Sequence, residues 1–504
     1  MRENNELFII KIDNISLYIK MKMNPNIDYK TVEFTGLPTS FFEQNRKNYI
    51  QQLKSKLTGL EENSILFLKG GKEIYRYDND DDLHYFMQES NFYYLTGVRE
   101  AGFYAMIDLT DSSVTLYVPT PDETTKIFFH VETLEEISAK YGARAVELEK
   151  MPTDINTRNP KAIYVLNGIN SDSGRKIYTC DYVFPEAIGH LNKRIDNNEI
   201  IYEVLADTRT VKTEEELALL QSLNDSTIEG HVNAMKNLKA GMIERDVENL
   251  FWETMIKKTY ARNHPYEHIC GCGNDGATLH YINNDKELKD GELILMDMGC
   301  KLCQYVSDVT STVPVNGKFT EKQKEIYQIV LNANREVIKN IKPGVFWTDM
   351  HLLAEKVILT GLKDLGLLTG DVQEMLDARV CYYFMPHGLG HLMGLDVHDV
   401  GGYLSFTPPR SKELGLSSLR SARVLAKSTV ITVEPGIYFN KYLLEKAFKE
   451  DKVAKYFVED KVREYFDFGG VRIEDDVYVT ETGCVNMTAK IPRTVEEIEA
   501  VMKK

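Results

Sequence analysis

Two aspartates eleven residues apart constrain this chain more than any other feature of its sequence. Asp297 follows the apolar run Glu292–Met296, and Asp308 precedes the strand-like run Val309–Val313. Gly299 favours a tight reversal between them, and a hairpin with an even loop would place both carboxylates opposite each other on one face. Cross-strand Cβ atoms lie roughly 4.5–5.5 Å apart. Two carboxylates that close repel unless a cation lies between them, so the pattern predicts a metal site.

Three further candidate ligands follow downstream. His391 closes the segment Pro386–His391, whose two glycines disfavour a helix and which lacks the glutamate of an HExxH zinc helix. A loop that directs imidazoles into a cleft fits this segment better. Glu434 ends the apolar run Thr429–Val433, and Glu474 lies among the apolar residues of another predicted strand. Carboxylates on buried strands are costly unless they are paired or bound to metal.

The donor set indicates which metal would bind. Four carboxylates and one imidazole make a hard, oxygen-rich site that favours two divalent ions of the Mn²⁺ kind, while the general order of affinities leaves Co²⁺ and Zn²⁺ open. A water held between two such ions is acidified toward neutral pH and becomes a hydroxide nucleophile, and the ions polarise a carbonyl oxygen. The predicted chemistry is metal-dependent hydrolysis.

The order of these ligands resembles the pita-bread metallopeptidases, which include methionine aminopeptidase, aminopeptidase P and the prolidases. The wider motifs are most similar to those of the prolidases, the Xaa-Pro dipeptidases. These motifs are Leu279–Tyr281, Phe384–His391, Gly394–Tyr403, Ser418–Arg423 and Phe468–Glu474. The resemblance extends from roughly Pro25 to the C-terminus.

The resemblance implies a role for each ligand. Asp297 would hold one ion, His391 and Glu434 would hold the other, and Asp308 and Glu474 would bridge both. Glu434 would also be the general acid/base that carries a proton from the metal-bound water to the leaving proline nitrogen.

The resemblance also implies substrate contacts. His280 and His398 would lie beside the substrate, where they would stabilise the tetrahedral intermediate or bind the scissile region. His387 would support the site or contact the proline carboxylate. A dipeptidase must recognise the free carboxylate of its second residue, and a planar guanidinium does so bidentately, which is the role expected of Arg420.

Three more residues have expected roles at or near the site. Arg472 is expected to support Glu474 from behind the metal site rather than to touch substrate. Tyr266 matches a tyrosine near the metals in relatives, where it either contacts substrate or helps to pack the site. Tyr94 matches an aromatic that can cover the pocket of a neighbouring subunit, with core packing as the alternative.

The chain has 504 residues, enough for two or three domains. We expect an N-terminal extension over 1–25, a creatinase-like α/β amino-terminal domain over 26–200, a linker over 201–212 and an α+β pita-bread catalytic domain over 213–504. In the first domain the patterns predict strands at 64–68, 103–107, 114–118 and 162–166, with helical stretches near 40–57 and 124–141. In the second they predict helices at 213–237, 243–258, 321–340 and 347–365, the first opened by a capping box.

Composition limits the partners. A net charge of −16 argues against nucleic acid, because phosphate binding needs basic clusters. The first twenty residues lack a signal-peptide pattern, and no apolar run has membrane-spanning length. Seven cysteines give no disulfide framework. We therefore expect a cytoplasmic protein without a membrane partner, and the resemblance implies a homodimer.

The leading prediction is a two-metal Xaa-Pro dipeptidase that releases free proline. The tertiary Xaa-Pro amide has no N–H, so it needs a site built for the ring. One alternative is an aminopeptidase P, which removes the N-terminal residue from longer Xaa-Pro peptides. Another is a non-catalytic pita-bread binding protein, which the presence of all the metal ligands disfavours.

Overall fold

The structure is a computed structural model that describes residues 8–12, 15–19, 24–25, 27–78, 85–178 and 182–503. The chain divides into two compact units, Gly36–Arg209 and the combination of Met1–Thr35 with Thr210–Lys504. Within the expected extension 1–25, the described part is an antiparallel hairpin of β1 (Phe8–Ile12) and β2 (Ile15–Ile19) together with residues 24 and 25. The rest of that extension lies outside the described residues.

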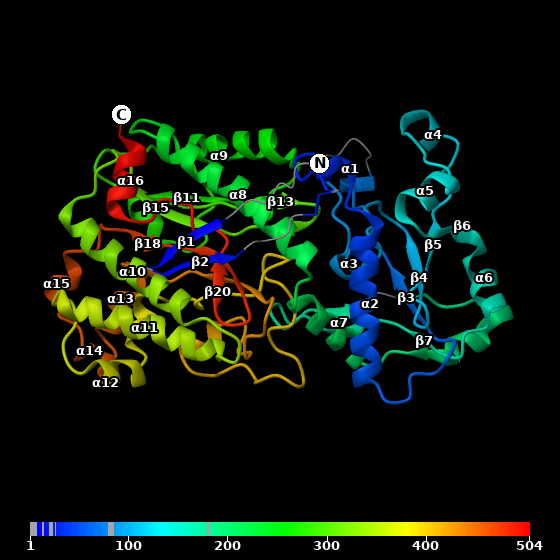
Figure 1. Cartoon of the computed structure of the whole chain (residues 1–504). Helices are drawn as coiled ribbons and strands as arrows, with labels where there is room; N and C mark the ends of the chain where they lie inside the picture. Colours follow the sequence, from blue (N-terminus) through cyan, green and yellow to red (C-terminus); the bar gives the residue numbers. More distant parts are fainter. Residues whose placement is uncertain are drawn as a thin grey trace. The chain divides into compact units, whose positions relative to one another are not determined.

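The unit Gly36–Arg209 is built on a mixed sheet with the strand order β10-β7-β3-β4-β5-β6. The strands are β3 (Ile65–Lys69), β4 (Tyr104–Asp108), β5 (Val114–Val118), β6 (Arg144–Glu147), β7 (Ile163–Tyr164) and β10 (Ile195–Asp196). Helices α2 (Thr39–Lys56), α5 (Leu134–Tyr141) and α6 (Met151–Arg158) flank this sheet (Figure 1). Helices on both faces explain why β3 and β5 are buried almost throughout instead of alternating.

The predicted strands of this unit are confirmed as β3, β4, β5 and a shorter β7. The helical stretch expected near 124–141 is instead two helices, α4 (Thr125–Phe128) and α5. The chain is extended at Phe129, and α5 begins anew at a capping box in which the Thr133 hydroxyl accepts a hydrogen bond from the backbone N–H of Glu136.

The segment 201–212, expected to be a linker, lies largely in helix α7 (Ile200–Thr210). Ile201, Val204 and Leu205 are fully buried, as the apolar face of a packed helix requires. The polar residues before position 200 suggested an exposed connection, but the apolar residues after it form structure.

The other unit carries its strands as short antiparallel ladders. One sheet is β11 (Ile269–Cys272), β12 (Leu293–Asp297) and β15 (Thr310–Pro314), and another is β16 (Val430–Val433), β19 (Asp475–Val479) and β20 (Cys484–Asn486). Strand β17 (Gly436–Tyr438) pairs with β18 (Gly470–Arg472), and β13 (Lys301–Leu302) pairs with β14 (Tyr305–Val306).

Four helices predicted for this unit are confirmed as α8 (Glu214–Asn237), α9 (Glu244–Thr259), α10 (Glu321–Asn340) and α11 (Trp347–Asp364). The strands lie between the α8–α9 pair and the α10–α11 pair (Figure 1). The predicted capping box opens α8: the Thr213 hydroxyl accepts from the Glu216 N–H at 3.1 Å, and the Glu216 carboxylate accepts from the Thr213 N–H at 2.7 Å.

Asp297 and Asp308 are not directly opposite each other. The partner of Asp297 in the β12–β15 ladder is Thr310, because the β13–β14 hairpin occupies the connection and shifts the register. Asp308 lies two residues before Thr310, which places it on the same face as a diagonal neighbour. The expectation of a shared face is met, but the direct opposition was wrong.

Arg493 joins the two principal sheets behind the site. Its guanidinium donates to the Thr310 carbonyl at 2.6 Å, to the Asp475 carboxylate at 2.8 Å and to the Glu474 carbonyl. The side chains of Arg493 and Asp475 are 9% and 3% exposed. The ends of β15 and β19 are therefore held together by a buried ion pair.

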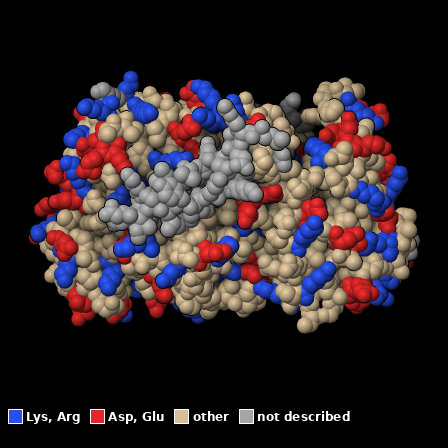
Figure 2. Space-filling view, viewed as in Figure 1, with Lys and Arg blue, Asp and Glu red and all other residues tan. Residues whose placement is uncertain are grey.

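None of the described helices combines the length and apolar character needed to span a bilayer. Figure 2 shows acidic and basic side chains interspersed over the visible face of the molecule. Lys257 and Glu253 form an exposed ion pair, and pairs of this kind add little stability.

We predict that Arg493→Met lowers the free energy of unfolding by about 3–5 kcal/mol, because it leaves the buried Asp475 carboxylate without its partner. Lys490→Met is the matched control, since the Lys490–Asp225 pair is exposed and should cost less than about 1 kcal/mol. Urea denaturation of both variants measures the difference. Equal losses would show that the buried pair does not hold the sheets.

Candidate functional site

One pocket in the unit that contains Thr210–Lys504 gathers side chains from distant parts of the sequence. Its volume is about 260 Å³. It is lined by every predicted metal ligand, Asp297, Asp308, His391, Glu434 and Glu474. It is also lined by most of the other predicted site residues, His280, His387, His398, Arg420 and Arg472.

The acidic side chains all lie where strands end. Asp297 is the last residue of β12 and Asp308 lies just before β15, while Glu434 follows β16 and Glu474 separates β18 from β19. A strand end lets a side chain turn toward a common centre while the ladder behind it fixes the backbone. The short ladders of this unit therefore converge on one point.

The ligand atoms are close enough to share cations. His391 Nε2 lies 3.3 Å from Asp308 Oδ2 and 3.6 Å from Glu434 Oε1. One ligand atom each of Asp308, His391 and Glu474 lies within 4.8 Å of the others. Nitrogen and oxygen donors bind divalent transition metals at about 2.0–2.2 Å, so an ion fits between these atoms.

The carboxyl groups are electrostatically crowded. Burial and the neighbouring Asp297 raise the pKa of Asp308 to about 8, and burial raises the pKa of Glu434 to about 7. Burial and the adjacent carboxylates raise the pKa of Glu474 well above its usual range. Among the described residues, Asp297 Oδ1 is buried without a hydrogen-bond partner. Crowded, buried acceptors that lack donors fit a site for cations.

His391 is held in the tautomer that a metal ligand needs. Its Nδ1 lies 3.1 Å from the Leu392 carbonyl, which can only accept, so Nδ1 carries the proton and Nε2 presents its lone pair to the acids. The backbone N–H of His391 donates to the Thr432 hydroxyl at 3.1 Å. A Cβ on Gly390 would lie 2.0 Å from the Thr432 carbonyl, so only glycine fits there. Trp347 Nε1 donates to the Gly390 carbonyl at 3.1 Å and fixes this loop on α11.

Arg472 contacts a different acid from the one expected. The sequence predicts support of Glu474, but Arg472 Nη2 donates directly to Asp297 Oδ2 at 2.7 Å. Its Nη1 donates to the Tyr438 hydroxyl at 2.9 Å and its Nε to the Thr310 hydroxyl at 3.0 Å. Thr310 in turn donates to Glu474 at 2.6 Å. The long side chain reaches across to β12, so its effect on Glu474 is indirect.

His387 has hydrogen-bond partners at both ring nitrogens. Nδ1 donates to the Gly388 carbonyl at 2.8 Å, and Nε2 lies 3.0 Å from the Tyr438 hydroxyl. Burial and the neighbouring Arg472 lower the pKa of His387 to about 3, so the ring is neutral. Of the two predicted roles, support of the site fits this arrangement better than contact with a carboxylate.

The remaining pocket histidines and arginine are more accessible than the ligands. His280 is exposed, and His398 and Arg420 are partly exposed, whereas Asp308 and His391 are buried. The His398 ring lies 4.5 Å from the His391 ring, centroid to centroid. These three side chains are therefore placed where a substrate can reach them.

Two predicted site tyrosines lie outside this pocket. Tyr266 lines a neighbouring cavity, and burial together with Asp297 and Asp308 raises the pKa of its hydroxyl. Of its two expected roles, packing behind the metal site fits this position. Tyr94 lies on α3 (Ser90–Thr96) and is 1% exposed. That burial contradicts a cover over a neighbouring subunit's pocket, which needs an exposed side chain, and agrees with core packing.

Several supporting residues escaped the sequence analysis. Asp476 accepts from the Asp308 N–H at 3.1 Å and is fully buried, and Tyr438 and Thr310 orient Arg472. The only local signal for Asp476 was its position two residues after Glu474, next to Asp475 at the start of a strand that continues with apolar residues. The others depend on contacts between strands that are distant in sequence.

Comparison with known proteins relates this site to characterised families. Residues 218–481 match metallopeptidase family M24, and residues 42–164 match the N-terminal domain of aminopeptidase P. The Xaa-Pro dipeptidase of Mus musculus is 40% identical over 476 residues, which cover 93% of this chain and 94% of the relative. A probable Xaa-Pro aminopeptidase of Sordaria macrospora is 34% identical over 484 residues, covering 96% and 100%.

Among solved structures, aminopeptidase P from Escherichia coli with the inhibitor Pro-Leu is similar, with a TM-score of 0.74 and 28% identity. The match covers 92% of this chain and 98% of that chain. Together with the two sequence-family matches, it confirms the predicted α/β amino-terminal domain followed by a pita-bread catalytic domain.

The acid cluster predicts a pH-dependent stability that metal should suppress. The folded-state pKa values of Asp308 and Glu434 exceed the unfolded values of about 4, so protonation stabilises the metal-free fold at low pH. That stabilisation is lost as pH rises from about 4 toward about 8. We expect the Tm of the metal-free protein to fall between about pH 5 and pH 8 by more than that of the Mn²⁺-loaded protein.

Differential scanning calorimetry at both pH values, with and without metal, measures this difference. Metal-free Asp308→Asn is the matched control, because it removes one of the repelling charges and should show a smaller fall. The same fall with and without Mn²⁺ would contradict a metal-neutralised cluster.

Proposed function

Because this chain belongs to metallopeptidase family M24, we propose that it hydrolyses Xaa-Pro dipeptides and releases free proline. Membership of the family makes it a hydrolase. The observation that carries the finer assignment is that Arg420 lines the same pocket as the clustered metal ligands. The similarity to Xaa-Pro dipeptidases over nearly the whole chain supports the same substrate class.

We propose that the pocket holds two divalent ions, most suitably Mn²⁺, with Co²⁺ or Zn²⁺ as alternatives. Asp297 would hold one, His391 and Glu434 the other, and Asp308 and Glu474 would bridge both. The crowding of the buried carboxyl groups and the His391 tautomer support this assignment. When bound, the ions acidify a water molecule and polarise the scissile carbonyl.

Glu434 is suited to move the proton. It lines the pocket with its Oε1 3.6 Å from His391 Nε2, and a carboxyl group placed there can act as a general acid/base. The proline nitrogen leaves as an amine and, like any amide nitrogen, needs a proton from a general acid to do so. Glu434 would accept a proton from the attacking water and deliver it to that nitrogen.

The pocket also offers charge for the other end of the substrate. Arg420 is partly exposed, and its guanidinium can bind the two oxygens of a carboxylate in parallel. In a dipeptide, proline carries that carboxylate; in a longer peptide, the same atoms form an amide without charge. His280 and His398 would line the scissile region, and Arg472 would keep Asp297 oriented behind the metals.

An aminopeptidase P activity on longer Xaa-Pro peptides is the second candidate. Its support is the 34% identity to a probable Xaa-Pro aminopeptidase and the similarity to aminopeptidase P structures. A non-catalytic role has less support, since every predicted metal ligand lines the pocket. We further propose a cytoplasmic location, and a homodimer, which the family resemblance implies.

Arg420 separates the two candidate activities. We expect the metal-restored protein to cleave Gly-Pro faster than Gly-Pro-Ala, and Arg420→Ala to lower kcat/KM for Gly-Pro by about 10–150-fold, as loss of a charge-assisted pair predicts. Arg420→Lys should retain an intermediate activity, because lysine keeps the positive charge but lacks the two parallel N–H groups of the guanidinium. Bound metal should not change in either variant. Equal rates of dipeptide and tripeptide cleavage would move the assignment to aminopeptidase P.

Glu434→Gln tests the proton transfer. The glutamine side chain keeps an oxygen atom that can bind metal, but it cannot accept and deliver the proton. We therefore expect kcat to fall by about 10²–10⁴-fold. Metal content, measured by elemental analysis, reports whether the loss arises from chemistry or from binding. A variant that keeps both its metal and its kcat would rule out Glu434 as the acid/base.

A further inference from the structure

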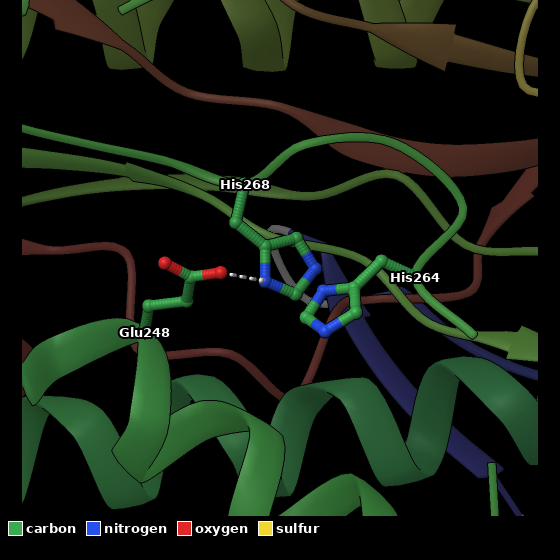
Figure 3. Close-up of side chains that lie close together, drawn as sticks. All are labelled: Glu248, His264 and His268. Carbon is green, nitrogen blue, oxygen red and sulfur yellow. Dashed lines mark ion pairs between the residues drawn. The ribbon is translucent and has the colours of Figure 1, made fainter. Parts of the chain in front are cut away.

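A second group of metal-ligating side chains lies outside the catalytic pocket. Glu248 comes from α9, and His264 and His268 come from the segment between α9 and β11. The three side chains point toward one another (Figure 3). One ligand atom of each lies within 4.8 Å of the other two. The proposed function uses none of them.

His268 carries a lone pair with no donor to satisfy it. Its Nε2 lies 2.8 Å from the Gly299 carbonyl, which can only accept, so Nε2 is protonated and Nδ1 is not. Nδ1 faces Glu248 Oε1 at 3.8 Å, which is beyond hydrogen-bond distance. The dashed line in Figure 3 joins these two atoms. Among the described residues Nδ1 has no hydrogen-bond partner, although His268 is 1% exposed.

A proton does not resolve this contact. A protonated Nδ1 would donate to the Glu248 carboxylate at hydrogen-bond distance, and the observed separation of 3.8 Å is longer than that. Two acceptors then face each other across this gap, an arrangement that costs free energy unless a cation lies between them.

The other two ligands are held in place by their neighbours. The His264 ring stacks on Trp252, with centroids 3.8 Å apart and planes inclined by 23°. Glu248 Oε2 accepts from Asn284 Nδ2 at 3.2 Å, which leaves Oε1 facing His268. The same amide donates to the His268 carbonyl at 2.8 Å. Asn284 therefore fixes both the carboxylate and the backbone of one histidine, as partners behind a metal site commonly do.

An ion could reach this group. Glu248, His264 and His268 line a cavity of about 540 Å³ that also includes Arg245. The Arg245 guanidinium is engaged by the Asn283 carbonyl, to which its Nη2 donates at 2.9 Å. The cavity thus has room for an ion and its water.

We propose that Glu248, His264 and His268 form a mononuclear site for a divalent transition-metal ion of the Zn²⁺ class, separate from the catalytic pair. Two imidazoles and one carboxylate are a donor set of three-ligand zinc sites, with the fourth position taken by water from the cavity. Tetrahedral bonds of about 2.0–2.1 Å require donor atoms about 3.3 Å apart. The partly exposed Glu248 and His264 can close that gap, while His268 is fixed by its bond to Gly299.

The position of His268 gives the ion a consequence for the neighbouring site. The Gly299 carbonyl that it holds lies two residues after Asp297, at the start of the turn that leads to Asp308. A Cβ on Gly299 would lie 2.0 Å from the Ser307 carbonyl, so the two sides of this turn are in close contact. An ion on His268 would keep Nε2 protonated and the turn in place. It would act as a positioning element and would not touch substrate.

Zinc content of the full-length protein tests the proposal. The wild type, His264→Gln and Glu248→Gln are stripped with chelator, equilibrated with Zn²⁺, desalted and measured by elemental mass spectrometry. We expect each variant to hold one zinc per chain fewer than the wild type. His190→Gln, at an exposed position in the other unit, is the matched control and should hold as much as the wild type. Unchanged zinc content in either site variant would overturn the proposal.

Circular dichroism and the Tm of each variant report whether it keeps its fold. Anomalous diffraction at the zinc edge from wild-type crystals gives an answer that needs no variant. A peak bonded to His268 Nδ1 would support the site, and its absence in zinc-equilibrated crystals would overturn it. Neither the zinc content nor the anomalous signal depends on which Xaa-Pro substrate the catalytic pocket accepts.

Discussion

Repulsion among buried carboxylates is the constraint around which the catalytic unit is arranged. Asp297, Asp308 and Glu474 lie at strand ends in one pocket, and Asp297 Oδ1 is buried there without a hydrogen-bond partner among the described residues. The protein supplies part of the missing positive charge itself. Arg472 binds Asp297 at the centre, and Arg493 ties the backbone around Glu474 to the neighbouring sheet. The remaining charge is left for cations, so the stability of this region and its chemistry depend on the same ions.

The helices and the residues that line the pocket as candidate metal ligands could be predicted because their signals are local. A capping box at Thr213 precedes a long amphipathic run, and an acid directly after an apolar strand is unusual enough to notice. The register between Asp297 and Asp308 could not be predicted in the same way. The β13–β14 hairpin that shifts it has two residues in each strand, which is too short to produce a periodic pattern.

What the sequence concealed depends on contacts between distant segments. Arg472 was placed with the acid two positions away, because neighbours in sequence are the only neighbours a sequence reveals. In the fold the long Arg472 side chain reaches Asp297 at the end of β12 instead. Glu248 and His268 likewise meet only because α9 packs against β11. Tyr94 and the apolar residues of α7 are buried, although the sequence left an exposed position open for both. Composition predicts the average burial of a residue type but not the burial of one residue.

The order of the metal ligands along the chain has a consequence for synthesis. Asp297 leaves the ribosome long before Glu474, and Arg493 follows later still. A nascent chain that has passed Asp308 therefore carries two of the four acidic residues, but it lacks Glu474 and Arg493. The full set of candidate ligands is present only after Glu474 has been translated. Binding of metal by this set would therefore require the folded arrangement of segments that are far apart in the sequence.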